Sequence, residues 1–378
     1  MSCNLSGKTI LITGGTGSLG TALLQILLTK YAGIKQIIVY SRDELKQFEE
    51  SERLATCKIL KWKLGDIRDF DRLKQVCKNV DYIFHLAALK QVPACERNPD
   101  ECIKTNITGT QNLIRAAHET GVTKVIAVST DKAVTPVNTY GASKLLMEKL
   151  ILSADSEQQG CQFSIVRFGN FAASRGSVIP LFLRQKHAGE KLTVTEPAMT
   201  RFCIREEDAA LCLIDVLTAM KGGETYIPKM KSYRIGDIAN AIAPPNQWKL
   251  SGIRVGERMH EELISRDESG IVLEAPHMLI ILPYRRLDEL DIYHQSYYQS
   301  IVHKNGYSYR SDLNNQWYTQ GDIHEMIWGN GLQSSADRHQ LIPASGSAAT
   351  KTSAPKTTKS ATTASEASAP VSGLSSSS

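Results

Sequence analysis

The stretch "TILITGGTGSLG", residues 9–20, decides the fold of this chain. Its first five residues are all apolar or β-branched, which is typical of a strand buried on both faces. Gly14, Gly17 and Gly20 come next, and residues 19–31 show apolar side chains at helical spacing. A strand, a glycine turn and a helix in this order predict a dinucleotide site, because glycines let the backbone approach a pyrophosphate and the helix N-terminus attracts it. The alternative is a tight turn with a purely structural role.

Strand-like stretches recur along the first half of the chain, each separated from the next by a helix-sized segment. They are residues 36–42, 59–66, 80–88, 122–130 and 163–170. Strands that alternate with helices predict a parallel sheet covered on both faces. We therefore expect an α/β fold with a Rossmann-type doubly wound sheet.

The chain divides into three parts by pattern. Residues 1–170 are expected to form most of the dinucleotide-binding core, with later segments returning to it. Over 171–332 the alternation loosens, and helical stretches such as 205–220 are interrupted by proline-containing loops. This predicts a smaller, mainly substrate-binding region that closes over the sheet as a lid. Residues 333–378 are rich in Ser, Ala, Thr and Pro with almost no large apolar residues, which predicts a disordered tail.

Composition narrows the class of protein. The 378 residues include 44 Lys and Arg against 39 Asp and Glu, and this small excess is spread along the chain, which argues against nucleic-acid binding. The sequence contains no run of 18 apolar residues, so we expect no membrane span, and the N-terminus lacks the anatomy of a signal peptide. The eight cysteines show no paired or metal-binding spacing. We expect free thiols, no metal and a cytoplasmic location.

The end of the second strand bears on the choice of cofactor. Ser41 and Arg42 suit the 2′-phosphate of NADP, whereas Asp43, directly after them, keeps NAD as an alternative because an acid there can hold a ribose hydroxyl. The expected cofactor-binding residues are Gly14, Thr16, Gly17, Ser18, Leu19, Gly20, Ser41, Arg42, Asp66, Ile67, Ala87, Ala88, Lys90, Tyr140 and Lys144.

A second motif, "TDKAVTPVNTYGASK" (130–144), places proton-transferring groups close together. Tyr140 and Lys144 are four residues apart, so they share one helix face. An ammonium near the phenol favours the phenolate, which accepts the proton of a sugar hydroxyl as hydride leaves. Asp131 and Lys132 directly follow a strand that ends at Thr130. The alternative for this pair is a loop cap with a surface ion pair.

With these motifs, the chain resembles the extended short-chain dehydrogenase/reductases that act on nucleotide sugars. More narrowly, it resembles the configuration-inverting UDP-N-acetylglucosamine 4,6-dehydratases that open pseudaminic acid synthesis. The resemblance covers roughly residues 7–330. It is carried by "ILITGGTGSLG", "YSRDELKQFE", "AALKQVPACERNPDECIKTNI", "STDKAVTPVNTYGASK", "RFGNFAASRGSVIP", "MTRFCI" and "GIRVGERMHEELIS".

The resemblance implies roles for individual positions. Tyr140 and Lys144 match the redox pair, Thr130 matches a hydroxyl at the strand end, and Asp131 and Lys132 match the acid and amine that distinguish these dehydratases. The implied substrate-binding residues are Lys90, Asn170, Arg175, Ser177, Val178, Arg254 and Glu257.

The same resemblance implies partners as well as residues. They are UDP-N-acetylglucosamine as substrate, tightly bound NADP that is regenerated in each turnover, and a homo-oligomer, with a hexamer as one candidate size. The sequence departs from the family pattern in "RVGE" for "RPGE", in "FAAS" for "VVGS" and in Gln91, where His is frequent. The segment 294–327 resembles the closing segment of the family, and its histidines leave metal binding there as an alternative.

The chemistry of dehydration explains why such residues are needed. Oxidation of C4 makes the C5 proton acidic, elimination then needs a base at C5 and an acid at C6, and hydride finally returns to C6. We assign C4 oxidation to Tyr140 with Lys144, the C5 base to Lys132 and the C6 acid to Asp131. These roles require a lowered pKa for Lys132 and a raised pKa for Asp131.

Two other functions remain open from the sequence. A UDP-sugar 4-epimerase uses the same fold, cofactor and Tyr–Lys pair, although it does not need Asp131 and Lys132. A cofactor-sensing regulator uses the same scaffold, but such proteins tend to lack the Tyr–Lys pair.

Overall fold

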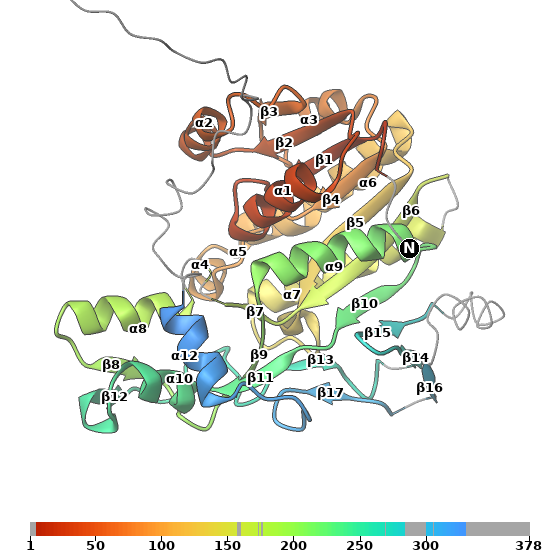
Figure 1. Ribbon diagram of the computed structural model, residues 1–378. Coiled ribbons are helices and arrows are strands. Elements are labelled where there is room, and N and C mark those ends of the chain that lie inside the picture. Colours follow the sequence, from red (N-terminus) through yellow and green to blue (C-terminus); the bar gives the residue numbers. More distant parts are fainter. Residues whose placement is uncertain are drawn as a thin grey trace, which may run out of the picture.

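The first strand of the fingerprint lies inside a ten-stranded sheet. In the computed structural model, which describes residues 5–156, 160–172, 174, 177–268, 270–283, 300–304 and 306–329, β1 (Thr9–Thr13) is buried at all five positions. The strand order is β16-β14-β15-β10-β6-β5-β4-β1-β2-β3 (Figure 1). Seven neighbouring strands, from β3 to β10, are parallel, and the last three pair antiparallel at the far edge. The other strands are β2 (Gln36–Ser41), β3 (Leu60–Leu64), β4 (Tyr82–His85), β5 (Lys124–Thr130), β6 (Gln162–Phe168), β10 (Thr225–Pro228), β14 (Ile271–Glu274), β15 (Met278–Ile281) and β16 (Ile301–Lys304).

This order, 3-2-1-4-5-6 for the first six strands, is the doubly wound Rossmann order, so the predicted fold class is confirmed. Each of the six predicted strands is present. The register is continuous from β1 to its neighbours, with Leu11 opposite both Ile38 and Ile83. Side chains of these central strands are buried on both faces, as parallel strands between helix layers require.

Helices cover both faces of the sheet. On one face, α1 (Ser18–Lys30) packs beside α9 (Glu206–Ala219), and their apolar residues share one buried cluster with β1, β2 and β10. Leu23 of α1 and Leu213 of α9 are fully buried in it, and each such leucine stabilises the fold by about 1.5–3 kcal/mol relative to exposure. On the other face lie α3 (Phe70–Cys77), α6 (Gly109–Thr120) and α7 (Thr139–Ser156).

The position of α9 differs from the expectation. We expected the helical stretch 205–220 in the lid, but α9 covers the main sheet. Its side chains Ala209, Ala210 and Leu213 are completely buried, so this face of the helix needs the sheet and α1 as partners.

A smaller part of the molecule follows β6 and has its own core (Figure 1). Its helices are α8 (Val178–His187), α10 (Ile235–Ile242) and α12 (Gln320–Trp328), and α12 begins with a capping box between Thr319 and Asp322. Its short strands are β7 (Asn170–Phe171), β8 (Leu192–Val194), β9 (Thr200–Ile204), β11 (Lys231–Arg234), β12 (Trp248–Leu250), β13 (Glu262–Ile264) and β17 (Tyr309–Arg310). The remaining elements are α2 (Glu44–Arg53), α4 (Val92–Arg97), α5 (Pro99–Ile103), the π-helical turn η1 (Lys104–Thr108), and the 3₁₀ turns η2 (Asp131–Ala133) and η3 (Pro245–Gln247).

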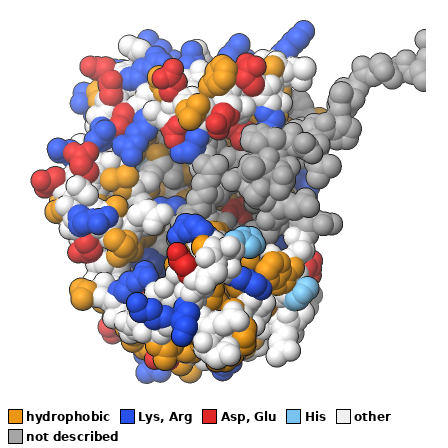
Figure 2. All heavy atoms as spheres, turned by 90° about the vertical axis from the view of Figure 1, so that its left-hand side faces the viewer, with side chains coloured by type: hydrophobic (Ala, Val, Ile, Leu, Met, Phe, Trp, Pro, Cys, Tyr) orange, Lys and Arg blue, Asp and Glu red, His pale blue; other side chains and the backbone are white. Residues whose placement is uncertain are grey.

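None of the helices in the described part of the chain has the length and apolar composition needed to cross a bilayer. The seven cysteines within the described ranges are all free thiols. Figure 2 shows acidic and basic side chains interspersed on the face that carries α2 and α8. The predicted tail, 333–378, lies outside the described residues.

Candidate functional site

A cavity of about 1140 Å³ lies at the carboxyl ends of β1, β2, β4 and β5, where it meets the smaller part of the molecule. Ligands of open parallel sheets bind at this edge, and a cavity of this size accommodates a dinucleotide together with a second ligand. Every predicted cofactor and substrate residue that the structure describes lines this cavity. Arg175 lies outside the described residues, and Asp131 lies behind the cavity wall with no exposed surface.

The glycine turn has the geometry of a phosphate cradle. Gly14 has a left-handed φ of +69°, and a Cβ on it would lie 2.8 Å from the backbone of Ala87. Gly17 is the N-cap of α1, and as a glycine it has no side chain that could accept a hydrogen bond from the first turn of that helix. The free backbone N–H groups of α1 therefore line the cavity, which fits the pyrophosphate of a dinucleotide.

The ribose end of the cavity carries two cations. Arg42, whose side chain is 53% exposed, lies 3.8 Å from Asp66, and Lys46 lines the same rim. Asp43 caps α2 by accepting a hydrogen bond from the backbone N–H of Lys46 at 3.1 Å. The carboxylate that favoured NAD in the sequence is thus already engaged with its own helix. Lys46 was missed in the sequence, where only its position four residues after Arg42 signals a shared rim.

The acid and amine of the second motif lie together at the end of β5. Both the hydroxyl of Thr130 and the amine of Lys132 donate to Asp131 Oδ1 at 2.9 Å. Asp131 is completely buried, and its Oδ2 has no hydrogen-bond partner among the described residues. The pair is therefore not a surface ion pair.

Tyr140 and Lys144 lie on the first turns of α7, against this pair. The helix comes this close because residue 141 is glycine: a Cβ there would lie 2.1 Å from the carbonyl oxygen of Lys132. Tyr140 is 8% exposed, and the Lys144 amine donates to the carbonyl of Val128 at 2.7 Å. The "YGASK" sequence thus combines the Tyr140–Lys144 pair with the glycine that lets the helix approach the backbone of Lys132.

Burial and charge set the protonation of these groups. Burial raises the pKa of Asp131 and lowers the pKa of Lys144 to about 8. Burial also raises the pKa of Tyr140 to about 12, although the Lys132 ammonium opposes this. These directions follow from the cost of placing a charge away from water.

The pKa of Lys132 runs opposite to our expectation. Burial alone lowers it, but the carboxylates of Asp131 and Glu261 outweigh burial and raise the pKa above its ordinary value. The assigned role required a lowered pKa, which a desolvated pocket would give against the attraction of Asp131; the fold adds Glu261 as a second carboxylate, and the attraction prevails.

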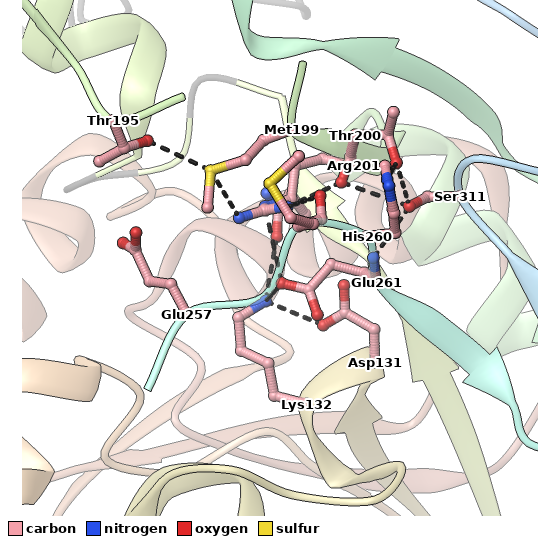
Figure 3. A network of polar contacts seen from close by, with 12 residues as sticks. Asp131, Lys132, Thr195, Met199, Thr200, Arg201, Glu257, His260, Glu261 and Ser311 are labelled. Carbon is pink, nitrogen blue, oxygen red and sulfur yellow. Dashed lines mark hydrogen bonds and ion pairs between the residues drawn. The ribbon is translucent and has the colours of Figure 1, made fainter. Parts of the chain in front are cut away.

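Glu261 and Arg201 are the site residues that sequence reasoning missed. Glu261 Oε1 lies 3.4 Å from the Lys132 amine, and Arg201 Nε lies 3.6 Å from the same oxygen (Figure 3). They belong to the motifs "GERMHEEL" and "MTRFCI". Nothing in a single sequence joins these motifs to Lys132, because the three residues come from distant parts of the chain.

The predicted substrate residues within the described ranges line the same cavity. Asn170 Oδ1 accepts a hydrogen bond from the Lys132 amine at 3.4 Å, and Arg254 lies 3.7 Å from Glu257. Ser177 Oγ and Glu257 Oε2 are buried without a partner among the described residues. Burial lowers the pKa of Lys90. Unsatisfied polar atoms on a cavity wall fit a polar ligand.

The part of the chain that the structure describes offers no metal site. The described residues include no group of three or more His, Cys, Asp or Glu side chains that could hold a metal ion. Part of the histidine-containing segment, residues 294–299 and 305, lies outside the described ranges.

The chain is similar in sequence to one family model and to known nucleotide-sugar enzymes. Residues 10–283 match the family model described as "Polysaccharide biosynthesis protein". A UDP-N-acetylglucosamine 4,6-dehydratase (inverting) of Campylobacter jejuni subsp. jejuni serotype O:23/36 (strain 81-176) is 44% identical over 328 residues, 85% of this chain and 98% of that protein. A UDP-glucose 4-epimerase of Rickettsia bellii (strain OSU 85-389) is 43% identical over 269 residues, 69% of this chain and 79% of that protein.

The chain also resembles solved protein structures. The X-ray structure of Pen from Bacillus thuringiensis is 36% identical with a TM-score of 0.76, covering 86% of this chain and 98% of that chain. More distant structures, at 18–24% identity and TM-scores of 0.55–0.61, include complexes with NAD and share the fold alone.

Proposed function

Because this chain belongs to the polysaccharide biosynthesis protein family, within the extended short-chain dehydrogenase/reductases, we propose that it is an inverting UDP-N-acetylglucosamine 4,6-dehydratase. The product is UDP-2-acetamido-2,6-dideoxy-β-L-arabino-hex-4-ulose. One observation carries the proposal beyond the family: the Lys132 amine, which lines the cavity together with Tyr140, is hydrogen-bonded to the buried carboxyl of Asp131 behind the cavity wall. An enzyme that only oxidises and reduces C4 has no use for this second acid–base pair.

The glycine turn and the N-terminus of α1 fit a nicotinamide dinucleotide, as the close approach at Gly14 indicates. When bound there, the dinucleotide supplies the acceptor that stores the C4 hydride and returns it at C6. The phenolate of Tyr140 accepts the proton of the C4 hydroxyl in the same step. The Lys132 ammonium stabilises that phenolate, since it is the cation that opposes the raised pKa of Tyr140.

The elimination needs a neutral amine and a protonated carboxyl at the same moment. The Asp131–Lys132 pair reaches this state when one proton moves along the 2.9 Å hydrogen bond from the amine to the carboxylate. The cost of this transfer depends on the difference between the two pKa values, which the raised pKa of Lys132 widens and the raised pKa of Asp131 narrows. Lys132 then removes the C5 proton, and Asp131 protonates the C6 hydroxyl, which leaves as water. Reprotonation of C5 on the opposite face inverts that centre.

Turnover of UDP-N-acetylglucosamine tests the assignment. Lys132→Ala and Asp131→Asn should each lose dehydration, and Tyr140→Phe should lose formation of the keto sugar altogether. Near wild-type dehydration in both Lys132→Ala and Asp131→Asn would remove these two roles. An NMR spectrum of the product formed in deuterated water reports water loss, deuterium at C5 and the C5 configuration together.

A UDP-sugar 4-epimerase is the second candidate, because the similarity to the Rickettsia bellii epimerase spans 269 residues. Mass spectrometry separates the two functions, since dehydration removes one water and epimerisation leaves the mass unchanged. A product of unchanged mass would favour the epimerase.

NADP is the cofactor we propose, because Arg42 and Lys46 line the rim while Asp43 caps its own helix. A cytoplasmic homo-oligomer, with a hexamer as one candidate size, and the division of the chain near residue 170 remain predictions. Size-exclusion chromatography with light scattering tests the oligomer.

A further inference from the structure

Glu261 and Asp131 both place a carboxylate beside the Lys132 amine. Its side chain is 4% exposed, and its Oε1 is 3.4 Å from the Lys132 amine, while Asp131 Oδ1 is 2.9 Å from the same amine (Figure 3). The amine therefore contacts two carboxylates. Only Asp131 belongs to the acid–base pair of the proposed reaction.

The backbone of Glu261 is fixed from outside the cavity. Its N–H donates to Ser311 Oγ at 2.9 Å, and its carbonyl accepts from the Ser311 N–H at 2.9 Å. Ser311 Oγ lies 2.7 Å from the hydroxyl of Thr200, which also contacts His260 Nδ1 at 2.8 Å (Figure 3). Arg201, next to Thr200, lies 3.6 Å from Glu261 Oε1. A carboxylate held this way cannot swing away from the amine at low cost.

We propose that Glu261 is a positioning residue that holds the Lys132 amine against the cavity and stabilises positive charge on its nitrogen. This rests on the proposed function, in which Lys132 gains a proton from C5. Glu261 stabilises the resting ammonium as well as the ammonium that forms when C5 loses its proton, so its contribution to the rate is to hold the nitrogen in place for the transfer. Glu261 also lines the cavity, and the role proposed for it acts through Lys132.

The surroundings of Lys132 support the direction of this effect. The charged and titratable groups that face its amine come from separate elements, and they are Asp131, Tyr140, Arg201, Tyr233 and Glu261. The two carboxylates raise the pKa of Lys132, and Arg201 opposes them. Burial would raise the pKa of Glu261, but Lys132 and Arg201 outweigh burial and lower it, so Glu261 remains ionised.

The test follows the neutral fraction of the Lys132 amine without using turnover. Trace acetylation of the cofactor-loaded protein at pH 9, read by peptide mass spectrometry, reports that fraction, and the side chain is 24% exposed to the reagent. Glu261→Gln removes the charge at nearly constant volume. We expect Lys132 to label about tenfold faster or more, since a carboxylate at this distance moves a pKa by about one to three. We also expect kcat for UDP-N-acetylglucosamine to fall about tenfold to a hundredfold with little change in KM.

Two further variants keep the test decisive. Glu261→Asp retains the charge but withdraws it by one methylene, so it should label between wild type and Glu261→Gln and serves if the glutamine variant does not fold. Glu262→Gln, the next residue on the chain and on the other side of β13, is the matched control and should label as wild type does. If Lys132 labels at the wild-type rate in Glu261→Gln, the inference is overturned. If only Glu261→Asp folds, a wild-type labelling rate in that variant overturns it. Lys132 could label faster in Glu261→Gln while the wild-type protein dehydrates no UDP-sugar. This result would support the effect of Glu261 on Lys132 and overturn the proposed function.

Discussion

Replacing Lys144 with methionine should change how stability depends on pH. The Lys144 side chain is 4% exposed, and burial lowers its pKa from the ordinary 10.5 to about 8. Below pH 8 the folded protein therefore carries a buried ammonium that the unfolded chain holds in water. One pKa unit corresponds to about 1.4 kcal/mol, so this gap destabilises the fold by about 3 kcal/mol at pH 7.

The sign of the pH effect follows from where the proton binds more tightly. Between pH 8 and 10.5 the unfolded chain binds the proton and the folded protein does not, so the destabilisation disappears as pH rises through this window. Lys144→Met removes the titration. It also loses the hydrogen bond to the Val128 carbonyl, a cost that does not depend on pH. Relative to wild type, the variant should thus be more stable at pH 7 than at pH 10 by about 2–3 kcal/mol.

Urea unfolding of the cofactor-free protein, followed by circular dichroism at both pH values, measures this difference. Cofactor must be removed because its binding stabilises the folded state by mass action. Lys249→Met, which removes an exposed lysine, is the control for the loss of one positive charge. An equal difference between Lys144→Met and wild type at pH 7 and pH 10 would refute the reasoning.

Three other changes have expected outcomes. Glu148→Gln removes one of the two carboxylates bonded to the Arg167 guanidinium, which is 2% exposed and bonded to Glu148 at 2.6 and 2.8 Å. Because Glu268 still pairs with Arg167, the free energy of unfolding should fall by about 1–3 kcal/mol in urea titrations, and an unchanged value would contradict this. Gly141→Ala puts a methyl group into the carbonyl of Lys132, so activity should fall at least about a hundredfold while the circular dichroism spectrum stays that of a folded protein. Arg42→Ala should raise the Kd for NADP at least about tenfold and leave the Kd for NAD nearly unchanged in fluorescence titrations, and an equal effect on both would exclude a 2′-phosphate contact.

The local pattern of the sequence determines the sheet and its ligand-binding edge. β1, the turn at Gly14 and α1 are adjacent in the chain, so their apolar runs and glycines are sufficient to specify them. The same holds for Thr130 to Lys144, where one strand end, a short turn and one helix start place four reactive groups within fifteen residues. Short-range geometry fixes such neighbours whatever the rest of the chain does.

The tertiary structure decides what depends on partners far along the chain. The helix at 206–219 is largely apolar wherever it lies, and only packing against α1 and the sheet assigns it to the core. The charge on Lys132 likewise depends on Glu261, which is 129 residues away in sequence yet 3.4 Å away in space. A pKa is set by burial and by charges within a few ångströms, and both come into being only when distant segments fold together.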